Sequence, residues 1–277
     1  MRKILNEKNG VAGVIVALLL VGFFISIIAF IQSVYVPQWM QEKEAEHMNE
    51  VATQFSQLKF AIDTLSASEQ KYSSISTPIT LGSKEIPFLF SSRSYGNLEI
   101  LSNDYRIIFT DIDGNYVSVP INSIRYSSEN AYYINQNYVY ENGAVILNQD
   151  SGDVITVQPN IYFENNEISL ELIRLYEYGG KTTASGFGIY PVQTRYSNSE
   201  MIDVYSIEHI TIYNSHLEAW ASFFDKFLSK EYGSDFDIQP TADGLGIEIS
   251  FTNIENLPNI LLKITDIKLQ IAPGWIE

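Results

Sequence analysis

Hydrophobic and polar positions divide the chain into stretches with different patterns. Residues 11–31 form an apolar run without a single charged side chain. About 20 apolar residues in a helix cross the roughly 30 Å hydrocarbon core of a bilayer, and a helix satisfies its own backbone groups there. The pattern therefore predicts a membrane-spanning helix over residues 11–36, which follows a short polar segment, residues 1–10.

A second helix is expected over residues 38–66, where apolar side chains recur every three or four positions. This apolar face consists of Met48, Val51, Phe55, Leu58, Ile62 and Leu65. The polar side chains expected to face water are His47, Glu50, Gln54, Gln57 and Lys59. Pro37 lies between the two helices, removes a backbone donor and clashes with the carbonyl of Ser33, so a kink or a short melted stretch is expected there.

The apolar face over 48–65 has three possible partners. It can pack on the chain's own body, on neighbouring subunits, or on a second copy in a parallel coiled coil. Packing on the body is the preferred interpretation. Because a helix has more than one side, contact with neighbouring subunits remains compatible with it.

Residues 67–88 are rich in Ser, Thr and Pro and are predicted to be a connector, followed by a β-rich domain over 89–277. Strands are expected within 98–121, 123–158, 160–178, 204–213, 246–251 and 260–272. The turn signals are Asp113-Gly114, Asn142-Gly143, Ser151-Gly152-Asp153 and Asn165-Asn166. Many short strands at this spacing are typical of a β-sandwich or barrel. The expected fold class is α+β: a long N-terminal helix, then a sandwich-like domain with one packed helix.

That packed helix is predicted over residues 214–233. Ser215 is a candidate N-cap with Glu218 three residues later, which is the capping-box pattern, and Gly233 would end the helix. Its apolar face comprises Leu217, Trp220, Phe224, Phe227 and Leu228. We expect the helix to lie across a sheet and fill the core.

Charge narrows the classes of partner. The chain has 17 basic and 33 acidic residues, for a net charge of −16, and no cysteine. This balance argues against binding a nucleic acid, because a phosphate backbone is bound by basic patches. The lack of cysteine excludes disulfides, catalytic thiols and thiolate metal sites.

The polar leader meets the apolar run at Gly10 and Val11, in EKNG–VAGVIVALLLVG. This junction resembles the class III, prepilin-type leader of archaeal type IV pilins, over residues 1 to about 66. Asn9, rather than a basic residue, precedes Gly10, and the acid of bacterial pilins is absent from residues 13–16. The resemblance implies that a prepilin peptidase cuts between Gly10 and Val11 and that the apolar helix then assembles copies of the chain, or other pilin-like subunits, into a surface filament or pseudopilus. The tyrosine-rich body also resembles, more generally, the extracellular part of archaeal pilin-like proteins.

Orientation and assembly can also be argued from the residues themselves. Basic side chains outnumber acids before the span and acids dominate after it, so the body should face outward from the cell membrane. Small residues let apolar helices approach one another closely, and the candidates are Ala12, Gly13, Ala17 and Gly22. The alternative is a monomeric, membrane-anchored surface protein that retains its leader and binds or adheres to an unknown ligand. A cleaved secretory signal fits less well, since the apolar run is long and no small-residue cleavage site follows it.

The search for catalytic chemistry yields no constellation, so we expect no enzyme, cofactor or metal. The three histidines, His47, His209 and His216, have none of the i+3 or i+4 spacings of a zinc pair, and structural roles are expected for them. Asp111, Asp113 and Asn115 suggest calcium, but Gly114 is misplaced for a calcium loop, and a hairpin turn is the preferred interpretation. Weak calcium binding by the loop acids Asp235, Asp237 and Asp243 remains an open alternative.

Overall fold

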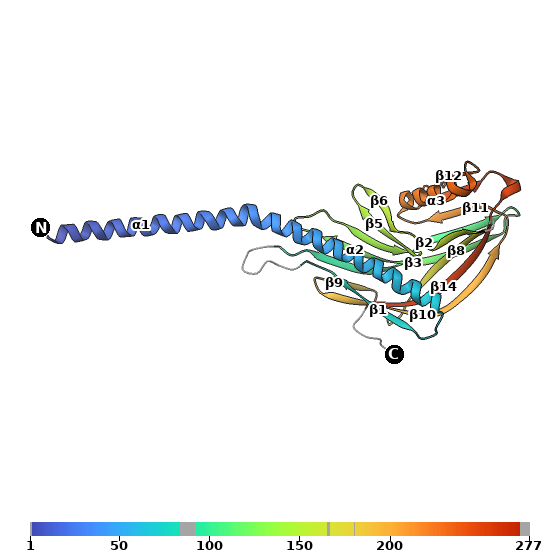
Figure 1. Ribbon diagram of the computed structural model, residues 1–277, viewed down its shortest axis with the longest axis horizontal. Coiled ribbons are helices and arrows are strands. Elements are labelled where there is room, and N and C mark those ends of the chain that lie inside the picture. Colours follow the sequence, from blue (N-terminus) through green and yellow to red (C-terminus); the bar gives the residue numbers. More distant parts are fainter. Residues whose placement is uncertain (1, 84–91, 165–166, 180, 272–277) are drawn as a thin grey trace.

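The computed structural model describes residues 2–83, 92–164, 167–179 and 181–271, and within 2–11 it describes the backbone only (Figure 1). The chain is α+β, as expected. A long helical rod leads into a mostly β body with curled sheets, and the second half of the rod lies along that body (Figure 1).

The rod consists of α1 (Arg2–Phe30), a π-helical turn (Ile31–Tyr35) and α2 (Val36–Ser68). Pro37 lies in the first turn of α2, where its missing N–H removes the bond to Ser33, and Ser33 itself lies in the π-helical turn. The irregularity at this point is therefore a change of helical register, and the chain remains helical through it. Glu69 ends α2 in the left-handed conformation, with φ of 50°.

A five-stranded sheet has the order β1-β10-β14-β8-β7, in which only β14 and β8 run parallel. Its strands are β1 (Ser74–Thr80), β7 (Ile161–Glu164), β8 (Glu167–Glu177), β10 (Ile189–Val204) and β14 (Asn259–Ile271). The predicted connector over 67–88 thus contains an edge strand. Pro78 argues against a strand at this point in the sequence, because proline has no N–H to donate to a neighbouring strand. At the edge of a sheet, where one side of the strand has no neighbour, proline is tolerated.

A nine-stranded antiparallel sheet has the order β12-β13-β11-β2-β3-β4-β5-β6, with β9 also pairing with β2. Its strands are β2 (Tyr95–Asp111), β3 (Tyr116–Glu129), β4 (Asn137–Glu141), β5 (Ala144–Gln149), β6 (Gly152–Val157), β9 (Thr183–Gly186), β11 (Ile207–Tyr213), β12 (Phe236–Pro240) and β13 (Gly246–Phe251). The expectation of uniformly short strands is wrong for β2, which has 17 residues, and for β10, which has 16.

The predicted turns at Asp113-Gly114 and Asn142-Gly143 are confirmed as hairpin connections between β2 and β3 and between β4 and β5. Three of these residues have positive φ: Gly114 (81°), Asn142 (46°) and Gly143 (75°). Consecutive positive values at Asn142 and Gly143 are what a tight two-residue hairpin requires. The Asn165-Asn166 turn lies outside the described residues.

Two hydrophobic cores occupy opposite faces of the same strands. In β8, Ile168, Leu170 and Leu172 belong to a core with α3, whereas Ile173 and Leu175 belong to a core with α2. Successive residues of a strand point to opposite faces, so the buried face changes sides at the middle of β8. The partner strand β14 changes in the same way, from Ile260, Leu262 and Ile264 to Ile267, Leu269 and Ile271.

The helix predicted over 214–233 is α3 (Leu217–Tyr232), and its packing against the core is confirmed. Trp220 stacks on Phe224 with ring centroids 5.9 Å apart. The proposed capping box is wrong: His216 occupies the N-cap position and makes no side-chain cap bond. Its imidazole Nδ1 instead lies 2.8 Å from the Asp153 carboxylate, which ties the helix start to β6.

Candidate functional site

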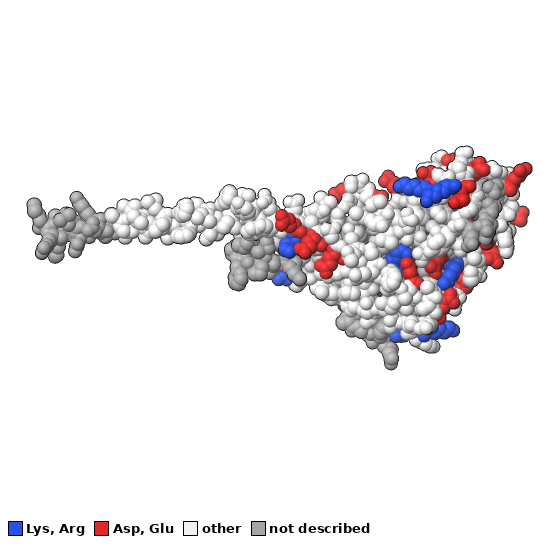
Figure 2. Space-filling model, viewed as in Figure 1, with Lys and Arg blue, Asp and Glu red and all other residues white. Residues whose placement is uncertain are grey.

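The exposed apolar helix α1 is the most unusual surface of the molecule. Every described side chain from Ala12 to Phe30 is exposed, and an 18-residue window with mean hydropathy 3.2 has none of its residues buried. Figure 2 shows no charged side chains on this part of the rod; they begin near the point where the rod meets the body. Length and composition are sufficient for the helix to cross a membrane.

Aromatic side chains mark the end of the exposed apolar stretch. The Tyr35 ring lies 5.7 Å from that of Phe30 and 5.8 Å from that of Trp39, centroid to centroid. Tyr35 and Trp39 are each about two-fifths exposed. Val36 and Met40, which directly follow them in the sequence, are buried. Amphipathic rings of this kind favour the interface between lipid and water.

The four small residues proposed for helix assembly do not share one face. Nothing lies within 4 Å of the position that a Cβ would take at Gly13 or at Gly22. These glycines are nine residues apart, which at 3.6 residues per turn places them on opposite sides of the helix. Ser26 and Ala29 continue the side of Gly22 at spacings of four and seven. The spacing of these small residues can be recognised in the sequence.

At Gly10 and Val11, the proposed processing site, the structure describes the backbone only. The backbone there is helical, as part of α1. Ala12 and Ala17 are exposed on the described part of the same helix.

The α2 apolar face packs on the chain's own body, which confirms the preferred interpretation. Met48, Val51, Phe55, Leu58, Ile62 and Leu65 are all at most 2% exposed and pack with residues of both sheets. Glu50 and Gln57 face water as expected. The expectation is wrong for His47, Gln54 and Lys59, which are buried.

Polar partners far away in the sequence explain these three buried side chains. His47 Nε2 lies 3.0 Å from the Thr80 carbonyl, and burial lowers the pKa of the imidazole. Gln54 accepts a bond from the Thr80 amide at 2.8 Å, so both side chains satisfy the edge of β1. Lys59 donates to Asp63 at 2.6 Å and to Asn160 at 3.1 Å. A buried polar group is tolerated when it is hydrogen-bonded in this way.

Glu44 fixes the beginning of the packed half of the rod. Its side chain is fully buried, and its carboxylate accepts the backbone N–H groups of Ala131 (3.0 Å), Tyr132 (2.7 Å) and Tyr133 (2.7 Å) from the β3–β4 loop. Bonds from N–H groups to an ionised carboxylate are stronger than neutral ones. The sequence gives no sign of this contact, since Glu44 lies among other acids.

A second buried acid holds α3 to the sheet. Glu141 Oε1 accepts bonds from Trp220 Nε1 and Asn214 Nδ2, both at 2.5 Å. Burial raises the pKa of Glu141 to about 8, an effect that the bond from Trp220 opposes and the nearby Asp104 charge reinforces. At neutral pH this carboxyl therefore tends to keep its proton.

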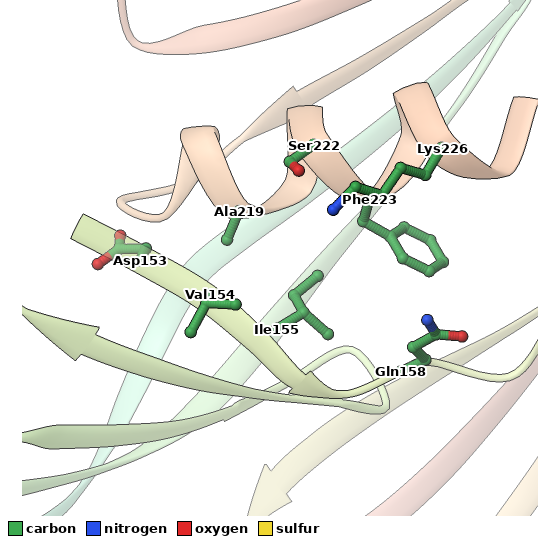
Figure 3. Close-up of a pocket in the computed structure, with 8 residues that line it drawn as sticks. All are labelled: Asp153, Val154, Ile155, Gln158, Ala219, Ser222, Phe223 and Lys226. Atoms are coloured by element: carbon green, nitrogen blue, oxygen red, sulfur yellow. The ribbon is translucent and has the colours of Figure 1, made fainter. Parts of the chain in front are cut away.

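A small hollow lies between α3 and β6 (Figure 3). It is lined by Asp153, Val154, Ile155, Gln158, Ala219, Ser222, Phe223 and Lys226. Its volume of about 90 Å³ is well below that of sites for drug-sized ligands, which are roughly 300–1,000 Å³. Asp153 already accepts bonds from Asn148 and His216. These contacts favour a structural role for the hollow.

The remaining candidate ligand groups are occupied by local bonds. Asp111 accepts the backbone N–H groups of Asp113 and Asn115, as in a hairpin turn, and the bond from the Asn115 side chain lowers its pKa. His209 Nδ1 lies 3.0 Å from Ser250 Oγ. Asp235 and Asp243 lie in loops and bond to Asn253 and Thr241, whereas Asp237, expected in a loop, lies in β12 and bonds to Gln239. Over the described residues, no three His, Cys, Asp or Glu side chains come together as a metal site.

Comparison of the chain with known protein families, with curated proteins and with solved structures finds no match.

Proposed function

We propose that the chain is a type IV pilin-like subunit, which is inserted in the cell membrane and then assembled through its N-terminal helix into a surface filament or pseudopilus. One observation carries the proposal: a helical stretch that is exposed and uncharged from Ala12 to Phe30 continues, through one π-helical turn, into a helix that packs on a β-rich body. The leader junction at Gly10 and Val11 adds the resemblance to archaeal pilins.

The energetics of the exposed helix favour assembly. Leu19, Phe23 and Ile28 are each more than half exposed, and no described residue of the body covers them. Lipid can surround such a helix, but neighbouring helices can too, so assembly exchanges lipid contacts for protein contacts. Gly13 and Gly22 point to opposite sides, which suits a helix with neighbours on more than one side.

The body would form the outer surface of the assembly. We treat its two sheets as sandwich-like, because the core around α3 takes side chains from both, such as Ile107 from β2 and Ile168 from β8. The excess of basic side chains before the span supports an orientation with the N-terminus in the cytoplasm, which would leave the body outside the cell.

The mature N-terminus tests the proposal. Mass spectrometry of the protein from its native membrane should give a chain that begins at Val11, and microscopy should show filaments. Gly10→Val should block processing and leave a membrane-bound precursor without filaments. Filaments formed by Gly10→Val would contradict the proposal. A mature chain that begins at Met1 and remains monomeric would support the membrane-anchored binding protein instead.

A further inference from the structure

A hollow of about 470 Å³ lies at the far end of α2, where α2 meets the five-stranded sheet. It is lined by Phe60, Asp63, Ala67, Asn160, Tyr162, Ser169, Leu170, Glu171, Met201 and Lys263. Its volume falls within the range of small-molecule sites, unlike that of the hollow under α3. We propose that this hollow is a binding site for a neutral saccharide.

Exposed apolar side chains form the walls. Phe60 on α2 is 72% exposed, Tyr162 on β7 is 65% exposed, and Met201 on β10 is 64% exposed. Three large side chains from three different elements leave apolar surface in water around one cavity, although single exposed residues are common. Aromatic faces of this kind stack on the C–H faces of sugar rings, while a tyrosine hydroxyl can bond to sugar hydroxyls.

Hydrogen-bonding groups form the floor. Asn160 donates to Asp63 at 3.2 Å and to Glu171 at 2.9 Å, and Lys59 donates to Asp63 at 2.6 Å. Lys263 lies 3.5 Å from Glu171. These contacts hold the two carboxylates in place before any ligand arrives, so binding needs little reordering.

The floor still has capacity for a ligand that donates hydrogen bonds. Each oxygen of an ionised carboxylate has about two acceptor positions, and each Asp63 oxygen accepts one bond from the described residues. Ser169 adds a hydroxyl that can donate or accept. Sugar hydroxyls match these acceptors, and the apolar face of a sugar ring matches the walls.

The charges around the hollow favour a neutral sugar over charged ligands. Asp63 and Glu171 repel an anion, and Lys59 and Lys263 within the same network repel a cation. In Figure 2, basic and acidic side chains are interspersed around the far end of α2, so neither sign dominates. A polyhydroxyl ligand without charge avoids both penalties.

Binding can be tested on the full chain in detergent by titration calorimetry and saturation-transfer NMR. The probes are cellobiose, mannobiose and diacetylchitobiose, with galacturonate and spermidine as charged comparisons. We expect at least one neutral disaccharide to bind with a dissociation constant of about 1 mM or tighter. The charged compounds should bind more weakly.

Two wall variants identify the site. Phe60→Ala and Tyr162→Ala should each weaken disaccharide binding about tenfold, which corresponds to about 1.4 kcal/mol, because each removes one stacking ring. Tyr116→Ala is the matched control, because Tyr116 is 71% exposed at the start of β3 and does not line the hollow. It should bind like the unmodified chain, and all three variants should keep the melting temperature.

Several results would overturn the proposal. These are a failure of all three neutral disaccharides to bind, tighter binding of galacturonate or spermidine, and undiminished binding by both wall variants. If Phe60→Ala and Tyr162→Ala change only the self-association seen by sedimentation, the walls are a contact between copies. None of these outcomes depends on cleavage at Gly10 or on filament formation.

Discussion

The two halves of the helical rod, α1 and α2, are both α-helical, but one is exposed and the other packs on the body. Over residues 12–30 of α1, apolar side chains lie on all sides of the helix and every side chain is exposed. In α2, one side is buried in the body and the others carry charge. A helix apolar on one face is explained by its own chain, whereas a helix apolar on all faces requires lipid or other proteins.

The difference can be expressed as free energy. Burying a large apolar side chain contributes about 1.5–3 kcal/mol. The apolar face of α2 obtains this stabilisation within the folded chain, because Val51, Phe55, Leu58 and Ile62 are fully buried. The described side chains of α1 are exposed and obtain none of this stabilisation within the folded chain. Membrane insertion and filament assembly would provide that gain from outside the chain.

The largest expected effect comes from separating the two halves. Removal of residues 1–35 should convert a detergent-requiring protein into a soluble one and abolish filaments, while the body stays folded. Val36 and Met40 are buried and remain in the truncated chain. Sedimentation and circular dichroism check this, and the melting temperature should change by no more than about 2 °C. A truncated body that is unfolded in buffer would show that α1 stabilises it.

The same substitution in each half sharpens the comparison. Phe55→Ala, in the fully buried apolar face of α2, should lower the free energy of unfolding of the body by about 3–5 kcal/mol, because the substitution leaves a cavity. Phe23→Ala, in α1, is the matched control and should leave body unfolding unchanged within about 0.5 kcal/mol. Denaturant titration followed by tryptophan fluorescence measures both. Equal losses would mean that α1 also packs on the body.

Local patterns were sufficient to predict both halves of the rod. An apolar run and a three-to-four spacing are properties of nearby residues, so the buried apolar positions of α2, part of the buried face of α3 and two hairpin turns followed from the sequence. The prediction for α3 included Trp220, Phe224 and Leu228 but missed Phe223, which is also buried. Long-range pairings could not be predicted in this way. Lys59 is buried because it meets Asn160, about 100 positions away, and β1 exists because β10 pairs with it.

The change of buried face within β8 and β14 also escaped prediction. Alternation indicates which residues share a face, but it does not indicate which face is buried when both become buried in turn. The hollow at the far end of α2 combines residues of α2, β7, β8, β10 and β14, so no local motif marks it.

The stability of the body should depend on pH through its buried carboxyl groups. The exposed half of the rod should not contribute to this dependence, because it has no charged side chain from Val11 to Met40. The pKa of Glu141 is raised from 4.5 to about 8 in the folded chain. Between these values the unfolded chain loses the proton while the folded chain keeps it. The contribution of Glu141 to stability is therefore fully present below about pH 4.5 and is lost as pH rises to about 8.

Glu141→Gln should remove this dependence. At pH 8 the variant should be more stable than the unmodified chain by roughly 4 kcal/mol, with little gain near pH 4.5. Glu208→Gln, on the partly exposed side of β11, serves as the control and should keep the original profile. Unfolding titrations across this pH range decide the matter. A sloping profile that persists in Glu141→Gln would assign the dependence to other groups.

The smallest effect concerns the point where the rod meets the body. Glu44→Gln keeps the shape of the side chain but removes its charge and replaces one acceptor with an amide that faces N–H donors of the β3–β4 loop. We expect a loss of about 1–2 kcal/mol in unfolding free energy and faster proteolysis within residues 130–136. Glu46→Gln is the control, because Glu46 is exposed two residues away and bonds to Lys43. If both variants behave alike, the buried carboxylate does not fix the rod. If only Glu44→Gln loosens the loop, a single acid sets the boundary between the half of the helix that the chain packs itself and the half that it leaves for other partners.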